Sequence, residues 1–209
     1  MIQLYGFSGT RSLRATWALE EAGADYTFIH VDLKQGAHKQ PEYLRVNPAG
    51  KVPALVDGDL VLTESAAICT YIGEKFPASG LVPPATQVAD RAHYFQWCFF
   101  AMSELESPLW TMAKHTFVLP EERRMPAIID TAKWEFARAA ELLAQHLEGR
   151  EYAVGNRFTA ADILLGSSLN WARSNKLPLE SPVLEDYADR LSARPALMRA
   201  REREAQAAT

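Results

Sequence analysis

The chain changes its hydrophobic pattern once, near residue 80, and this change constrains the fold more than any other feature. Before it, short runs with the alternation and β-branched content of strands take turns with runs of helical spacing. The expected strands cover residues 2–5, 26–31, 52–56 and 60–63. The expected helices cover residues 12–23, 41–46 and 64–75. After residue 86 only helical spacing is present.

The first part therefore has the element order β-α-β-α-β-β-α, which predicts a mixed sheet covered by helices. Its last two strands are joined by Asp57-Gly58-Asp59, and Asp-Gly is a strong hairpin signal. Prolines and glycines between residues 77 and 84 then interrupt the pattern and predict a linker. We expect an α/β domain over residues 1–77, a linker over residues 78–85 and an all-helical domain over residues 86–209.

The helical part contains one clear helix start. Thr159 precedes an apolar run and Asp162 follows three residues later, which is the spacing of a capping box. We expect that helix to run through Ser174. Other helices are expected over residues 86–117 and 120–147, and a last one from about Leu184 into the alanine-rich tail.

Composition limits the class of protein. The 209 residues are 48% apolar and 23% charged, which is ordinary for a globular chain with a real core. The net charge of −4 does not favour nucleic acid or an anionic membrane surface as a partner. No apolar run approaches the roughly 20 residues of a membrane span. Two cysteines without a CxxC pair fit a reducing cytoplasm, and we expect both to be packing residues.

Three motifs carry a resemblance to a known family. Residues 47–55 read NPAGKVPAL, residues 63–68 read TESAAI, and residues 157–163 read RFTAADI. They resemble the NPxGxVPxL segment, the xESxAI helix start and the xxTxADI capping box of the cytosolic glutathione S-transferases. The order and spacing match over essentially the whole chain. The glutathione-site motifs are theta- or phi-like, and the first loop is similar to that of bacterial members of the serine or threonine type.

The resemblance implies a thioredoxin-like βαβαββα domain that binds glutathione, followed by a helical domain that holds a small electrophile. It implies a cytoplasmic homodimer that acts in detoxification, with glutathione as co-substrate and no metal. Residues 86–117 are rich in aromatic side chains, some of which would line the second-substrate pocket and most of which would be core. In the family the acid of the capping box is structural, so we assign Asp162 to folding.

Four residues are expected to hold the γ-glutamyl and cysteinyl parts of glutathione. The resemblance implies a cis peptide bond between Val52 and Pro53, whose bent backbone pairs with the cysteinyl backbone of the ligand. The alternative is an ordinary trans proline at the start of a strand. Glu64 and Ser65 begin a helix, where free N–H groups favour a carboxylate. They would bind the amine and carboxylate of the γ-glutamyl group, or serve only as helix caps.

The glycine carboxylate of glutathione needs cations. His38, Lys39 and Lys51 stand at the positions that the resemblance implies for this contact. The alternative is that all three are solvated surface charges.

The group that activates the thiol is expected between the first strand and the first helix. Family members use tyrosine, serine or cysteine there, and this chain has no cysteine in that stretch. The candidates, in order of preference, are Thr10, Ser8, Ser12 and Tyr5. Each hydroxyl is alternatively a loop or capping group, Ser12 in particular.

Two other functions remain open from the sequence. One is a glutathione-dependent reductase of disulfides or peroxides, or an isomerase, on the same fold. The other is a non-catalytic glutathione transferase-like binding protein. The intact motif around Lys51, Val52 and Pro53 favours a chain that still binds the ligand.

Overall fold

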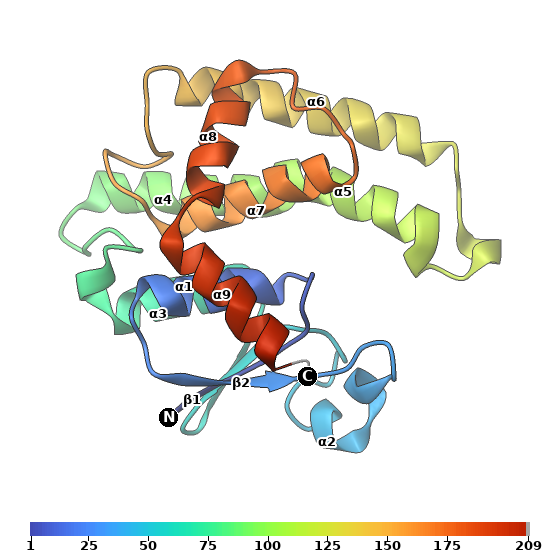
Figure 1. Ribbon diagram of the computed structural model, residues 1–209. Coiled ribbons are helices and arrows are strands. Elements are labelled where there is room, and N and C mark those ends of the chain that lie inside the picture. The colour runs from blue at the N-terminus through green and yellow to red at the C-terminus, as the bar shows by residue number, and fades with distance from the viewer. Residues whose placement is uncertain (208–209) are drawn as a thin grey trace. The chain divides into compact units, whose positions relative to one another are not determined.

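The computed structural model describes residues 1–207, which form two compact units (Figure 1). One unit holds residues 1–82 and the segment that begins at Ala193, and the other holds residues 83–192. The change of unit between Val82 and Pro83 lies inside the linker expected at residues 78–85. The C-terminal segment departs from the expected division, because its helix α9 (Pro195–Gln206) packs on α1 (Ser12–Glu21).

The first unit contains one mixed sheet with the strand order β2-β1-β3-β4. Its strands are β1 (Ile2–Gly6), β2 (Tyr26–His30), β3 (Ala54–Asp57) and β4 (Leu60–Thr63). Strand β1 pairs parallel with β2 and antiparallel with β3, and β3 pairs antiparallel with β4. The predicted thioredoxin-like order is therefore confirmed. Strand β3 begins two residues later than expected, after the proline that cannot donate to a ladder.

Helices cover both faces of this sheet. They are α1, α2 (Pro41–Leu44), α3 (Ser65–Lys75) and α9. Helix α1 packs on α3 and on β1, whereas Tyr43 of α2 packs on Tyr5 from the opposite face. Gly6 allows α1 to start close to the sheet, since a Cβ atom there would lie 2.8 Å from Cβ of Ser12.

The second unit consists of helices and the loops that join them. The helices are α4 (Val88–Phe100), α5 (Glu106–Ala113), α6 (Ile128–Leu147), α7 (Ala160–Ser174) and α8 (Pro182–Ser192). The expected helix over residues 86–117 is a continuous path with two π-helical turns, Ala101–Leu105 and Lys114–Val118. Helix α6 starts later than expected, after Pro126. The single helix expected from Leu184 is wrong: α8 ends at Ser192, and Pro195 starts α9.

Helix α7 carries much of the core of the second unit. The capping box that starts it is confirmed, with Thr159 and Asp162 bonded reciprocally. The fully buried Asp162 carboxylate also accepts a hydrogen bond from the amide of Ala153 and one from the hydroxyl of Tyr187. These contacts tie α7 to the preceding loop and to α8.

Both cysteines are buried free thiols, as expected for packing residues. Burial raises the pKa of the Cys98 thiol to about 12, so it stays protonated at neutral pH. A thiolate role for this residue is therefore unfavourable.

Candidate active site

The strand register brings three segments of the first unit to one edge of the sheet. Tyr5 of β1 lies opposite Ala54 of β3, and Ala54 lies opposite Thr63 of β4. The segment after β1, the segment before β3 and the segment after β4 therefore meet at the same edge. These are the segments that hold most of the site residues expected from the sequence.

The segment after β1 is a turn that leads into α1, and two of its hydroxyls are bonded to the turn itself. The Thr10 hydroxyl donates to the carbonyl of Phe7 at 2.6 Å. Oγ of the fully buried Ser12 lies 2.9 Å from Oγ1 of Thr10 and accepts from the amide of Phe7. Because the Thr10 proton goes to Phe7, the Ser12 hydroxyl is the donor in the contact between the two side chains.

Ser8 differs from both. Its side chain is exposed at the tip of the turn, and its hydroxyl has no hydrogen bond within residues 1–207. Of the three candidate hydroxyls in this turn, the Ser8 hydroxyl is the one whose proton is available to a ligand.

Tyr5 points to the other face of the sheet. Side chains alternate along a strand, and the neighbouring Gly6 faces α1. The Tyr5 ring lies 5.9 Å from the ring of Tyr43 and packs against the cluster formed by Val31, Tyr43 and Ala54. The phenol is therefore separated from the hydroxyls of the turn.

The segment before β3 contains a cis peptide bond between Val52 and Pro53. Neither the amide nor the carbonyl of Val52 forms a hydrogen bond within the described chain. The preceding carbonyl, that of Lys51, is fixed by two donors: the Tyr43 hydroxyl at 2.5 Å and the Asn47 amide at 2.7 Å. A rigid turn therefore presents an unpaired backbone edge beside β1.

The segment after β4 starts α3. Glu64 precedes the helix with a φ of 65°, which is a strained conformation for a residue with a side chain. Ser65 is the first helical residue and is almost fully buried. Its Oγ accepts a hydrogen bond of 3.4 Å from Nη1 of Arg14, a buried side chain of α1. The start of α3 thus combines free helical N–H groups with a positive charge behind the serine.

The three expected cations, His38, Lys39 and Lys51, lie in the segment that joins β2 to β3. Gly50 packs against the backbone of His38, since a Cβ atom on it would lie 3.0 Å from that carbonyl. This contact brings His38 next to Lys51. The side chains of Lys39 and Lys51 are exposed and form no ion pair within residues 1–207, while Nδ1 of His38 is buried without a hydrogen bond.

Three supporting residues were not identified from the sequence. Nothing in the sequence indicates the role of Arg14, and only the fold reveals that it lies behind Ser65. Tyr43 and Asn47 hold the Lys51 carbonyl. Asn47 carries a usable signal, since it opens the NPAGKVPAL segment, whereas Tyr43 carries none.

Comparison with known proteins decides the family. A model of the glutathione S-transferase N-terminal domain matches residues 1–74, and a model of the C-terminal domain matches residues 107–195. The chain belongs to the glutathione S-transferase family. Glutathione S-transferase 3 of Zea mays is 32% identical over 95% of this chain and 92% of its own length.

Two further relatives bear on the reaction. The disulfide-bond oxidoreductase YfcG of Escherichia coli is 32% identical over 94% of this chain and 92% of its own length. The structure of glutathione transferase URE2P6 from Phanerochaete chrysosporium in complex with oxidised glutathione is 29% identical, with a TM-score of 0.84. The match between the two covers 99% of this chain and 97% of the URE2P6 chain. The chain is an enzyme of the glutathione S-transferase family, and its relatives carry more than one reaction name.

Residues 1–207 contain neither a membrane-spanning helix nor a metal-binding cluster. No helix in that range is long and apolar enough to cross a membrane. No group of three or more histidine, cysteine, aspartate or glutamate side chains in the same range has the arrangement of a metal site.

Proposed function

We propose that this glutathione S-transferase binds glutathione at the sheet edge described above and stabilises its thiolate for attack on an apolar electrophile. The sulfur forms a bond to the electrophilic carbon, the leaving group departs with its electron pair, and the thiol proton passes to solvent. The observation that carries the proposal is the register that joins Tyr5, Ala54 and Thr63, because it gathers the expected binding segments at one edge.

Each part of glutathione has a complementary group in this proposal. The γ-glutamyl carboxylate binds Ser65 and the N–H groups at the start of α3, and the amine pairs with Glu64. The cysteinyl backbone pairs with the unbonded amide and carbonyl of Val52, beside Pro53. The glycine carboxylate is bound by three cations of the segment between β2 and β3, namely His38, Lys39 and Lys51.

Thiol activation is assigned to the turn between β1 and α1. A free thiol has a pKa near 8.5, so a shift of two units requires about 2.7 kcal/mol. A charge-assisted hydrogen bond together with the N-terminal end of α1 is of that size. The bonding pattern of the turn moves Ser8 ahead of Thr10 as the donor, since the Thr10 proton is engaged by Phe7. Ser12 and Tyr5 rank below these two as donors, because Ser12 is buried and Tyr5 lies on the opposite face of the sheet.

The remaining parts of the proposal come from the family. The second substrate is a small apolar electrophile held by the helical unit. The enzyme is a homodimer of the cytoplasm, with a role in detoxification. Gel filtration with light scattering tests the dimer, and a monomer at micromolar concentration would contradict it.

A second candidate function is glutathione-dependent disulfide reduction, in which two glutathione molecules convert a disulfide to two thiols and become glutathione disulfide. The similarity to a protein named disulfide-bond oxidoreductase favours it. The chain lacks a cysteine in the β1–α1 turn, so glutathione itself must be the nucleophile in either reaction.

Parallel assays separate the two functions. The full chain is supplied with glutathione and either chlorodinitrobenzene, a mixed disulfide or an organic peroxide. The primary proposal predicts that kcat/KM is largest for chlorodinitrobenzene. Faster turnover of the disulfide would support the second candidate, and no turnover together with no calorimetric glutathione binding at millimolar concentration would contradict both.

A further inference from the structure

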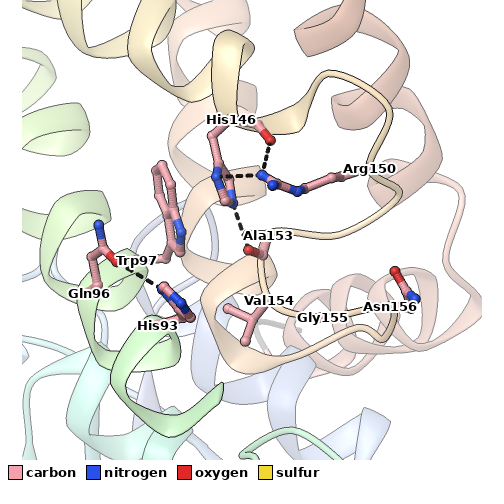
Figure 2. A pocket seen from close by; sticks show the side chains of 9 residues that line it. All are labelled: His93, Gln96, Trp97, His146, Arg150, Ala153, Val154, Gly155 and Asn156. Carbon is pink, nitrogen blue, oxygen red and sulfur yellow. Dashed lines mark hydrogen bonds between the residues drawn. The ribbon is translucent and has the colours of Figure 1, made fainter. Parts of the chain in front are cut away.

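A pocket lies entirely within the helical unit. Its volume is about 370 Å³, and all of its lining residues come from α4, α6 and the loop between α6 and α7. In Figure 2, His93, Gln96 and Trp97 of α4 stand on one side, and His146 and Arg150 lie on the other. None of these residues belongs to the glutathione site proposed above.

Hydrogen bonds fix the imidazole of His146 in one neutral tautomer. Its Nε2 lies 2.8 Å from the carbonyl oxygen of Ala153, which can only accept, so Nε2 carries the proton. Its Nδ1 lies 2.9 Å from Nη1 of Arg150, which can only donate, so Nδ1 is the acceptor. Burial, together with the positive charge of Arg150, lowers the pKa of His146 and keeps this neutral form.

The same bonds orient the guanidinium of Arg150. Its Nη1 donates to Nδ1 and also to the backbone carbonyl of His146 at 2.7 Å, which uses both of its protons. The Nε and Nη2 groups form no hydrogen bond within residues 1–207. Those two groups form the edge of a guanidinium that binds a carboxylate through two parallel hydrogen bonds.

The charge of the pocket has one sign. No aspartate or glutamate among residues 1–207 lines it, and its charged side chain is that of Arg150. His93, on the α4 side, is held by Gln96, with 3.1 Å between Nδ1 and the amide oxygen. An anion that enters therefore meets a fixed cation and no repelling carboxylate on the lining.

The rest of the lining is apolar except for Asn156. The indole of Trp97 stacks on His146 with 4.0 Å between ring centroids, and Val154 lies beside Ala153 at the base (Figure 2). Trp97 is 7% exposed and Val154 is 1% exposed, so the indole supplies most of the apolar side-chain surface that a ligand can reach. A bare inorganic anion would leave it unused.

We propose that this pocket is a binding site for a small organic carboxylate, with the carboxylate on the Nε and Nη2 edge of Arg150 and the apolar group against the indole of Trp97. His146 acts as a positioning residue, because it holds the guanidinium in place through two bonds to Nη1.

Calorimetry with benzoate tests the proposal on the full chain. We expect binding with a dissociation constant on the order of 1 mM. Arg150→Gln should weaken it by about tenfold to a hundredfold, the effect of losing a charge-assisted bidentate pair. The matched control is Arg138→Gln on α6, which removes an exposed arginine that stacks on Trp134 and should leave benzoate affinity unchanged.

Two other ligands complete the test. Benzamide, which keeps the ring without the charge, should bind at least tenfold more weakly than benzoate. Inorganic phosphate, which keeps charge without the ring, should do the same. The proposal is overturned if benzoate does not bind, if Arg150→Gln binds it as wild type does, or if either other ligand binds equally well. A thermal melt of both variants confirms that each is folded.

Discussion

The guanidinium of Arg14 lies behind Ser65, with 3.4 Å between its Nη1 atom and the serine Oγ. Because the guanidinium only donates, the serine oxygen accepts, and the serine proton is left for a group on the other side. In our proposal that group is the γ-glutamyl carboxylate of glutathione. Arg14 is then a positioning residue that orients Ser65 and adds positive charge at the start of α3.

Replacement of Ser65 by alanine should therefore weaken glutathione binding. We expect KM for glutathione to rise about tenfold, the cost of one hydrogen bond to a charged group, while kcat stays within about twofold. The contact between Ser65 and glutathione is present in both the bound ground state and the transition state, so the substitution destabilises both states equally. Thr70→Ala is the control, since the Thr70 hydroxyl bonds within α3 to the carbonyl of Ala66. An unchanged KM for Ser65→Ala would remove this residue from the site.

Replacement of Lys51 by methionine tests the contact to the glycine carboxylate. The variant should bind glutathione about three- to tenfold more weakly, because an exposed ion pair contributes about 1 kcal/mol. It should bind γ-glutamylcysteine, which lacks the glycine, as well as wild type does. Lys34→Met, an exposed lysine earlier in the same loop region, is the control. Equal losses for both ligands would place Lys51 elsewhere.

The predictable parts of the fold are those with a local signal. The strands and the hairpin follow from alternation and from Asp57-Gly58, and the start of α7 follows from its capping box. Pro195 is a usable signal for the break before α9, and the expectation of a single helix from Leu184 did not take it into account. The two π-helical turns have no comparable signal, because they arise from packing over a long path.

The candidate site divides in the same way. The NPAGKVPAL and TESAAI motifs locate the expected binding segments in the sequence, and the contacts of those segments with glutathione stay a prediction. The hydroxyl of the turn could not be chosen, since the bond from Thr10 to Phe7 depends on a rotamer and a loop path. The burial of Arg14 behind Ser65 depends on contacts between residues 51 positions apart.

Glu204 should make stability depend on pH. This carboxyl of α9 is buried, and the Thr16 hydroxyl donates to it at 2.8 Å. Burial raises its pKa from 4.5 to about 7, so folding favours the protonated form. That contribution is complete below pH 4.5 and is lost as pH rises through about 7. The shift corresponds to about 3 kcal/mol.

Glu204→Gln should remove this dependence while keeping an acceptor for Thr16. Urea denaturation at pH 5 and pH 8 measures the free energy of unfolding of both proteins. Relative to wild type, the free energy of unfolding of the variant should increase by up to about 3 kcal/mol from pH 5 to pH 8. A constant difference would show that Glu204 does not change its protonation in this range.

Asp162 should matter for folding and not for chemistry. Its carboxylate accepts hydrogen bonds from Ala153, Thr159 and Tyr187 in the interior of the second unit. Asp162→Ala leaves these buried donors without a partner, so we expect a loss of about 3 to 5 kcal/mol in the free energy of unfolding. Asp130→Ala, an exposed acid of α6, should cost less than about 1 kcal/mol. A small effect at Asp162 would contradict the structural role.

The central claim is that the turn between β1 and α1 stabilises the glutathione thiolate, with Ser8 as the donor. The ultraviolet absorbance of the thiolate, titrated against pH with glutathione bound, measures this directly. In wild type the bound thiol should have a pKa one to two units below the free value of about 8.5. Ser8→Ala should raise it by about one to two units, and Thr10→Val, Ser12→Ala and Tyr5→Phe should each have a smaller effect. A bound thiol that titrates like free glutathione, or a shift caused by Tyr5→Phe alone, would contradict the account.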